Sequence, residues 1–123
     1  MPNKEEDNQK YIAQQILGQQ LQQIEQQIAS VDMQIIELIS LKDSLIELTK
    51  VKSKKIYTPL GAGVFIESEL KKVDDVLVNV GAGIVVKKDA NSAAELISSQ
   101  VEELKKIKDQ IQKEFDELVS SLR

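Results

Sequence analysis

Hydrophobic positions in the first part of the chain follow a helical repeat. From Leu17 onward they are separated alternately by four and three residues, which is typical of a coiled coil. The set comprises Leu17, Leu21, Ile24, Ile28, Val31, Ile35 and Leu38. The same register reaches Lys42, Leu45 and Thr49, and a lysine at such a core position commonly determines register. We expect one long helix over residues 4–52, with Asn3 and Glu6 as a capping pair.

The last part of the chain carries the same repeat of four and three. Its members are Ile97, Val101, Leu104, Lys108, Ile111, Phe115, Leu118 and Leu122. Ser92 lies three residues before Glu95, the spacing of a reciprocal capping pair at a helix N-terminus. This pattern predicts a second helix over residues 91–123, with its first full turn near Ala93.

Residues 53–90 change to short, β-branched runs bounded by glycine or acidic residues. The runs IYTPL, VFIESEL, VLVNV and IVVKK read as four strands. Leu60–Val64 (LGAGV) recurs twenty residues later as Val80–Ile84 (VGAGI), which indicates an internal duplication. Glycines on both sides of one alanine allow the positive φ angles of tight turns. The segment therefore predicts two β-hairpins, joined by the run LKKVDD.

The three parts combine into one predicted domain over residues 1–123. We expect a mainly α fold with a small β part: a long antiparallel two-helix coiled coil joined by two β-hairpins. Packing the two seams places Leu21 opposite Leu122 and Ile28 opposite Phe115. In this register the first helix extends beyond the second and leaves an apolar stripe without a partner, which is typical of a binding surface. The candidate binding residues at this free end are Tyr11, Ile12, Ile16, Leu17, Leu21, Phe115, Leu118, Val119 and Leu122.

The two hairpins form the other candidate interaction surface. Two-stranded hairpins are marginal alone and present unpaired edges, so we expect their strands to assemble with strands of other subunits into an oligomeric β-barrel hub. The expected hub residues are the turn glycines and one aliphatic face: Ile56, Leu60, Gly61, Gly63, Val64, Ile66, Val76, Val78, Val80, Gly81, Gly83, Ile84 and Val86.

Composition narrows the function classes. The 123 residues include no His and no Cys, which excludes disulfides, imidazole or thiolate zinc ligands and Ser–His or Cys nucleophiles. A net charge of −4 argues against a nucleic-acid partner. Each Gly-Ala-Gly is followed by a strand rather than a helix, so no nucleotide motif is completed. We expect no catalytic residue, metal or cofactor, and no enzyme activity.

No apolar run approaches a membrane span, and no leader pattern precedes the first helix, so we expect a soluble, cytoplasmic chain.

The order long helix, two hairpins, long helix resembles the alpha class of prefoldin subunits. The resemblance covers nearly the whole chain, and its most specific parts are TPLGAGVFIESEL at residues 58–70 and VLVNVGAGIVVKKDANSAAE at residues 76–95. It implies a hexamer of two alpha-class and four beta-class chains, whose hairpins build a double barrel carrying six coiled coils. It also implies an ATP-independent holdase that captures unfolded clients at the coiled-coil tips and delivers them to a group II chaperonin.

A second hypothesis remains open at this point. The chain could be a coiled-coil scaffold or tether whose apolar stripe binds one folded partner protein, without holding unfolded clients. Saturable binding to a single native protein would favour the scaffold, whereas suppression of client aggregation would favour the holdase.

Overall fold

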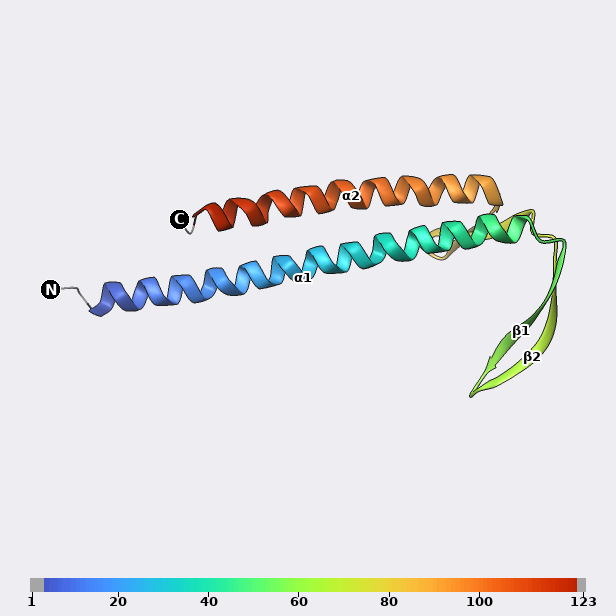
Figure 1. Ribbon diagram of the computed structural model, residues 1–123, viewed down its shortest axis with the longest axis horizontal. Coiled ribbons are helices and arrows are strands. Elements are labelled where there is room, and N and C mark those ends of the chain that lie inside the picture. The colour runs from blue at the N-terminus through green and yellow to red at the C-terminus, as the bar shows by residue number, and fades with distance from the viewer. Residues whose placement is uncertain (1–3, 122–123) are drawn as a thin grey trace. The chain divides into compact units, whose positions relative to one another are not determined.

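A computed structural model of the chain describes residues 4–121, and Figure 1 shows the two long helices and the β1–β2 hairpin. Asn3 of the predicted capping pair and Leu122 of the predicted seam lie outside the described residues. The elements are α1 (Lys4–Thr49), β1 (Ser53–Gly61), β2 (Val64–Lys71), β3 (Asp75–Gly81), β4 (Ile84–Asp89) and α2 (Ala90–Ser121). This order matches the predicted fold class of two long helices and two antiparallel hairpins.

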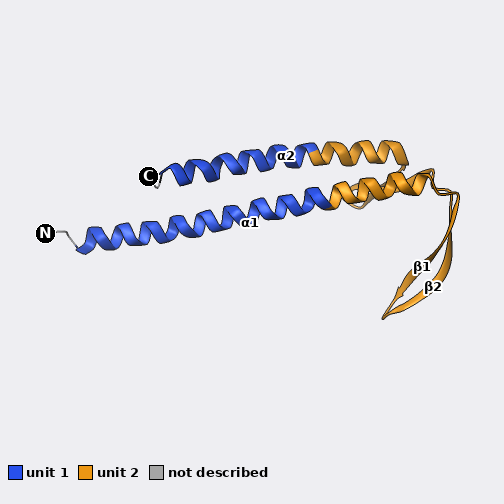
Figure 2. Ribbon diagram, viewed as in Figure 1, with its two compact units in different colours: residues 1–36, 102–123 blue, residues 37–101 orange. Residues whose placement is uncertain are grey.

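The chain divides into two compact units (Figure 2). Unit 1 comprises Met1–Ile36 and Glu102–Arg123, and unit 2 comprises Glu37–Val101. Unit 1 therefore holds the larger part of both helices, while unit 2 holds the helix ends and both hairpins.

Within unit 1, burial follows the predicted repeat. The seam residues are buried or half-buried, whereas their neighbours on the outer face are mostly exposed. On α1 these seam residues are Leu17, Leu21, Ile24, Ile28, Val31 and Ile35, and on α2 they are Leu104, Lys108, Ile111, Phe115 and Leu118. An apolar stripe at this spacing stays on one side of a helix, so it can pack against the matching stripe of the second helix.

A charged pair interrupts the seam of unit 1. The ammonium group of Lys108 lies 2.7 Å from a carboxylate oxygen of Asp32, and both side chains are partly shielded from water. An ion pair at a core lysine favours the register that brings the two charges together. Lys108 is a member of the predicted repeat although it is charged, and Asp32 is its partner in the structure. Lys42, the other predicted core lysine, is half-buried in unit 2.

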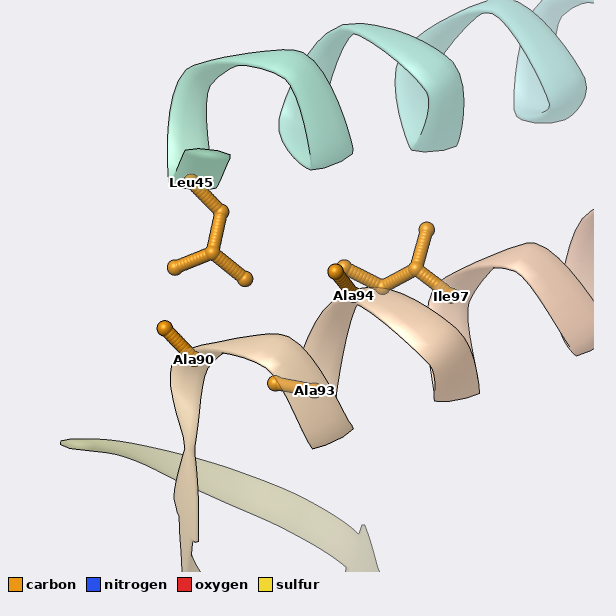
Figure 3. Packing of buried hydrophobic residues seen from close by; sticks show 5 residues of the cluster. All are labelled: Leu45, Ala90, Ala93, Ala94 and Ile97. Carbon is orange, nitrogen blue, oxygen red and sulfur yellow. The ribbon is translucent and has the colours of Figure 1, made fainter. Parts of the chain in front are cut away.

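Unit 2 contains a small core between the ends of the two helices. Leu45 of α1 points toward Ala90, Ala93, Ala94 and Ile97 of α2 (Figure 3). Leu38 from α1 and Val76 and Val78 from β3 pack against the same cluster. Three alanines in the first two turns of α2 leave room for the larger side chains of the opposing helix and strand.

The two hairpins form separate two-stranded sheets with the orders β1-β2 and β3-β4. Their turns share one backbone geometry: Ala62 and Gly63 have φ of 51° and 79°, and Ala82 and Gly83 have φ of 52° and 75°. Two successive residues with positive φ make the reversal that suits the right-handed twist of a hairpin. Each turn is preceded by a register shift, between Pro59 and Gly61 in one hairpin and between Asn79 and Gly81 in the other.

The start of α2 differs from the prediction. Asp89, rather than Ser92, caps the helix: one of its carboxylate oxygens accepts the backbone N–H of Ser92 at 2.7 Å. The Ser92 hydroxyl donates to the second oxygen at 3.0 Å. These two hydrogen bonds are the main reason why the pKa of Asp89 lies below its ordinary value of 3.8. The helix therefore follows β4 directly, and Ser92 takes the position three residues inside it.

Candidate interaction surfaces

The described residues contain no group of three or more potential metal ligands. No helix within residues 4–121 is long and apolar enough to cross a membrane. Apolar side chains are exposed on α1 and on both hairpins, and an apolar hollow lies beside β3.

The first surface is a short apolar stripe near the start of α1. Tyr11, Ile12 and Ile16 expose 61%, 53% and 50% of their surface. The Tyr11 hydroxyl accepts a hydrogen bond from the Gln15 side chain at 3.1 Å, so its ring lies along the helix surface. A group of exposed apolar side chains is a candidate contact site. The structure thus places these three predicted tip residues together on the surface of one helix.

Four of the other predicted tip residues lie in the seam of unit 1. Leu17, Leu21, Phe115 and Leu118 are half-buried, because the repeat directs them toward the other helix of unit 1, and Val119 beside the seam is half-buried as well. Leu122 lies outside the described residues. Leu17, Phe115, Leu118 and Val119 are therefore less exposed than Tyr11, Ile12 and Ile16, and their contact with clients stays a prediction.

The second surface is the end of the β1–β2 hairpin. Residues 57–66 include no charged side chain, and their large members are exposed: Tyr57, Leu60, Val64, Phe65 and Ile66. Tyr57 pairs with Glu67, and Phe65 pairs with Pro59. Since side chains alternate between the two faces of a hairpin, Tyr57 and Phe65 are diagonal neighbours on one face. The base of the same hairpin is polar, with a Lys55–Glu67 ion pair of 3.4 Å.

The β3–β4 hairpin presents different surroundings on its two faces. Val76 and Val78 are half-buried because they pack against the core of unit 2. Leu77, on the opposite face, exposes 73% of its surface. Val80, Ile84, Val85 and Val86 are also exposed. Of the predicted hub residues, Val76 and Val78 therefore contact their own chain's helices, while those near the two turns remain free.

Unit 2 also contains an apolar hollow of about 350 Å³ that sequence reasoning did not find. It is lined by α1, by four consecutive residues of β3 and by the first turns of α2: Leu38, Leu41, Leu45, Val76, Leu77, Val78, Asn79, Ala93, Leu96, Ile97 and Gln100. Leu41 exposes 53% of its surface. Leu41 is adjacent to the seam residue Lys42, and Leu96 is adjacent to the seam residue Ile97. They line the same hollow because β3 packs beside both helices, which the sequence pattern does not show.

The comparisons with known proteins agree on one family. The family described as Prefoldin subunit matches residues 17–123. Prefoldin subunit alpha of Methanobrevibacter smithii is 42% identical over 89 residues, covering 72% of this chain and 61% of the relative. Prefoldin subunit alpha of a Methanococcus maripaludis strain is 32% identical over 115 residues, covering 90% of this chain and 78% of the relative.

A solved structure supports the fold. The chain in a cryo-EM structure of filamentous prefoldin from Methanocaldococcus jannaschii matches with a TM-score of 0.81, at 21% identity, over 91% of this chain and 93% of that one. The duplicated hairpin, the paired helix repeats and these matches lead to the same result. The chain belongs to the prefoldin subunit family, in its alpha class.

Proposed function

We propose that this chain is the alpha subunit of an ATP-independent holdase. In this proposal two alpha and four beta-class chains form a hexamer, whose hairpins close into a β-barrel hub. Its coiled-coil tips capture unfolded proteins and pass them to a group II chaperonin in the cytoplasm. Family membership supports the chaperone class, and the apolar surfaces of the chain indicate how each part would act.

The observation that carries the proposal is the exposed stripe of Tyr11, Ile12 and Ile16. Contact with apolar side chains is non-directional, so one stripe can accept many different unfolded segments. Burying one such side chain contributes about 1.5–3 kcal/mol before ordering costs. Several tips acting on one client would then bind tightly through avidity, while each single contact stays weak enough for release.

The open hairpins support the assembly part of the proposal. Every described strand has one edge without a partner strand, and the apolar side chains near both turns face water in the single chain. Unpaired edges flanked by apolar side chains are unfavourable in solution and favour pairing with other strands. Beta-class subunits would supply these strands and close the barrel.

The test compares two triple variants in the complex assembled with its beta-class subunit. Tyr11→Ser, Ile12→Ser and Ile16→Ser remove the stripe. Met33→Ser, Ile36→Ser and Ile39→Ser remove three other exposed apolar residues of α1, at 57%, 61% and 43% exposure, as the matched control. The readout is light scattering of a chemically unfolded client, together with the mass of the complex.

We expect the stripe variant to require at least tenfold more complex to suppress client aggregation, with its mass unchanged. The control variant should suppress aggregation as the unmodified complex does. Equal suppression by both variants would overturn the tip assignment. Binding of one folded protein without any effect on unfolded clients would favour the scaffold instead. Transfer of a captured client to a group II chaperonin, followed by client refolding, tests the delivery step.

A further inference from the structure

The outward side of α1 carries almost no charge beyond the exposed stripe. Residues 15–27 include seven glutamines, and every one of them is exposed. Glu25 is the single charged residue in this range, and no lysine or arginine occurs between Lys10 and Lys42. The glutamine face consists of Gln15, Gln19, Gln20, Gln22, Gln23, Gln26 and Gln27. The outward side of a helix usually mixes charged and polar side chains, whereas this one consists of neutral amides.

The other helix of unit 1 shows the usual pattern. Its outward positions, separated by three and four residues, are charged with alternating sign, and all are exposed: Glu102, Lys106, Asp109, Lys113 and Asp116. Both helices have the same buried seam, so contact with the other helix does not explain why α1 alone lacks outward charge. The difference indicates a contact made by α1 with another molecule.

The glutamine face is continuous with the exposed stripe. Residues three and four positions apart share one side of a helix, so two rows of glutamines begin at stripe residues. The row that begins at Ile12 contains Gln15, Gln19, Gln22 and Gln26, and the row that begins at Ile16 contains Gln20, Gln23 and Gln27. From Ile12 to Gln26 the helix rises about 21 Å, which is the length of roughly six residues of an extended chain.

The amide groups of this face are available to another molecule. Gln15 donates a hydrogen bond to the Tyr11 hydroxyl, and no other glutamine of the face bonds through its side chain to a described residue. Each glutamine offers two N–H donors and one carbonyl acceptor, which match the N–H and C=O groups of a peptide backbone. A folded protein has already paired most of its backbone groups, whereas an unfolded segment presents them freely.

We propose that the glutamine face extends the client-binding surface from the stripe along α1 and binds the backbone of uncharged, extended client segments. The inference rests on the proposed holdase function and adds a substrate class to it. Hydrogen bonds to the backbone do not depend on the client's sequence. A charged client side chain would lose water at this face without gaining an opposite charge, so highly charged segments bind less well.

The first experiment measures the affinity of two labelled peptides for the complex assembled with the beta-class subunit, by fluorescence anisotropy. The peptides share their apolar residues, which alternate with serine and glutamine in one and with lysine in the other. Gln22→Glu with Gln26→Glu places two carboxylates on the glutamine face. Gln110→Glu with Gln112→Glu is the matched control, because it adds the same charge at exposed glutamines of α2.

We expect the variant of the glutamine face to bind the neutral peptide about three- to tenfold more weakly, because donors are lost and charge is added, and to bind the lysine peptide more tightly. The control variant should bind the neutral peptide as the unmodified complex does. Equal affinities of the two variants would overturn the proposal. So would a doubled mass of the unmodified complex that only the Gln22→Glu, Gln26→Glu variant abolishes, since a second complex would then cover the face.

The serine variant of the stripe separates this inference from the proposed function. Weaker peptide binding after Tyr11→Ser, Ile12→Ser and Ile16→Ser, with no effect of Gln22→Glu and Gln26→Glu, would overturn the glutamine face and leave the holdase proposal intact.

A second experiment locates the bound segment directly. The chain has no cysteine, so Gln22→Cys can carry a single benzophenone group, attached before assembly, that cross-links a bound peptide on illumination. We expect Gln22→Cys to cross-link the neutral peptide strongly and Gln110→Cys, the control on α2, to do so weakly. An excess of chemically unfolded client should remove the product. Equal cross-linking from the two sites would overturn the proposal.

Discussion

The two hairpins are near duplicates with different surroundings. Both reverse through Gly-Ala-Gly with φ values that agree within a few degrees, and both carry a register shift at the same place. Thr58 and Val78 occupy equivalent positions twenty residues apart. Thr58 shares a 2.8 Å hydrogen bond with Ser68 on an exposed surface, whereas Val78 packs against the helical core. The shared Gly-Ala-Gly sequence therefore determines the turn geometry. Single side chains, such as Thr58 against Val78, determine whether the hairpin faces water or packs against the helices.

The largest expected effect tests this difference in packing. Val78→Asp should lower the free energy of unfolding by about 2 kcal/mol, because it places an unpaired charge against the apolar core of unit 2. Thr58→Asp at the equivalent position should change it by less than about 0.5 kcal/mol, since Thr58 is exposed. Urea unfolding followed by circular dichroism measures both. Equal losses would contradict the packing of β3 against the helices.

A smaller effect tests the shared turn geometry. Gly63→Ala and Gly83→Ala should each cost about 1 kcal/mol, since both glycines have positive φ that an L side chain adopts with strain. No heavy atom lies within 4 Å of an added Cβ at either site, so strain alone should set the cost. Amide hydrogen exchange within each hairpin measures the cost locally.

The helical residue Gly18 supplies the control for this substitution. Its surroundings are equally open, but its φ is helical, so Gly18→Ala should stabilise the chain by up to about 1 kcal/mol. A Gly63→Ala chain as stable as the unmodified one would show that the turn does not adopt the left-handed conformation in solution.

The smallest effect concerns the ends of the hairpins. Glu69 and Asp89 are equivalent in the duplication; Glu69 accepts a hydrogen bond from the Ser53 hydroxyl at 2.6 Å, while Asp89 caps α2. Because hydrogen bonds from Ser92 lower the pKa of Asp89, its contribution is present above pH 3.8 and is lost as the pH falls through the lowered pKa.

Asp89→Ala should therefore speed exchange of the Ser92 amide at neutral pH, and its difference from the unmodified chain should shrink in acid. Glu69→Ala should leave that amide unchanged. A difference that stays constant down to pH 2 would show that the charge of Asp89 does not contribute to the cap.

Much of the fold was predictable because it depends on local periodicity. The spacing from Leu17 to Leu45 identified the buried side of α1, since a helical repeat determines which residues share a face whatever they pack against. The run from Ile97 to Leu118 did the same for α2. The glycines of the two turns were predictable for a related reason, because few residues tolerate positive φ.

The surfaces were less predictable because they depend on segments distant in sequence. The exposure of Tyr11, Ile12 and Ile16 agrees with the predicted stripe, whereas Phe115 and Val119 are half-buried beside the other helix. Asp89 was missed as a cap because its position at the end of β4 became clear only once the helix began at Ala90. The ion pair of Lys108 with Asp32 needed the register between the helices.

The sequence by itself determined the order of the elements, the seam of each helix and the positions of both turns, whereas the positive φ of Ala62 and Ala82 came from the structure. These depend on backbone preferences and on periods of a few residues, which any chain of this pattern satisfies locally. Only the tertiary structure decided that Val76 and Val78 face the helices, and that Leu41 and Leu96 line one hollow together with β3. Both features require α1, β3 and α2, which are far apart in sequence, to pack together. The packing is stabilised by burial of apolar surface, which depends on all three segments at once.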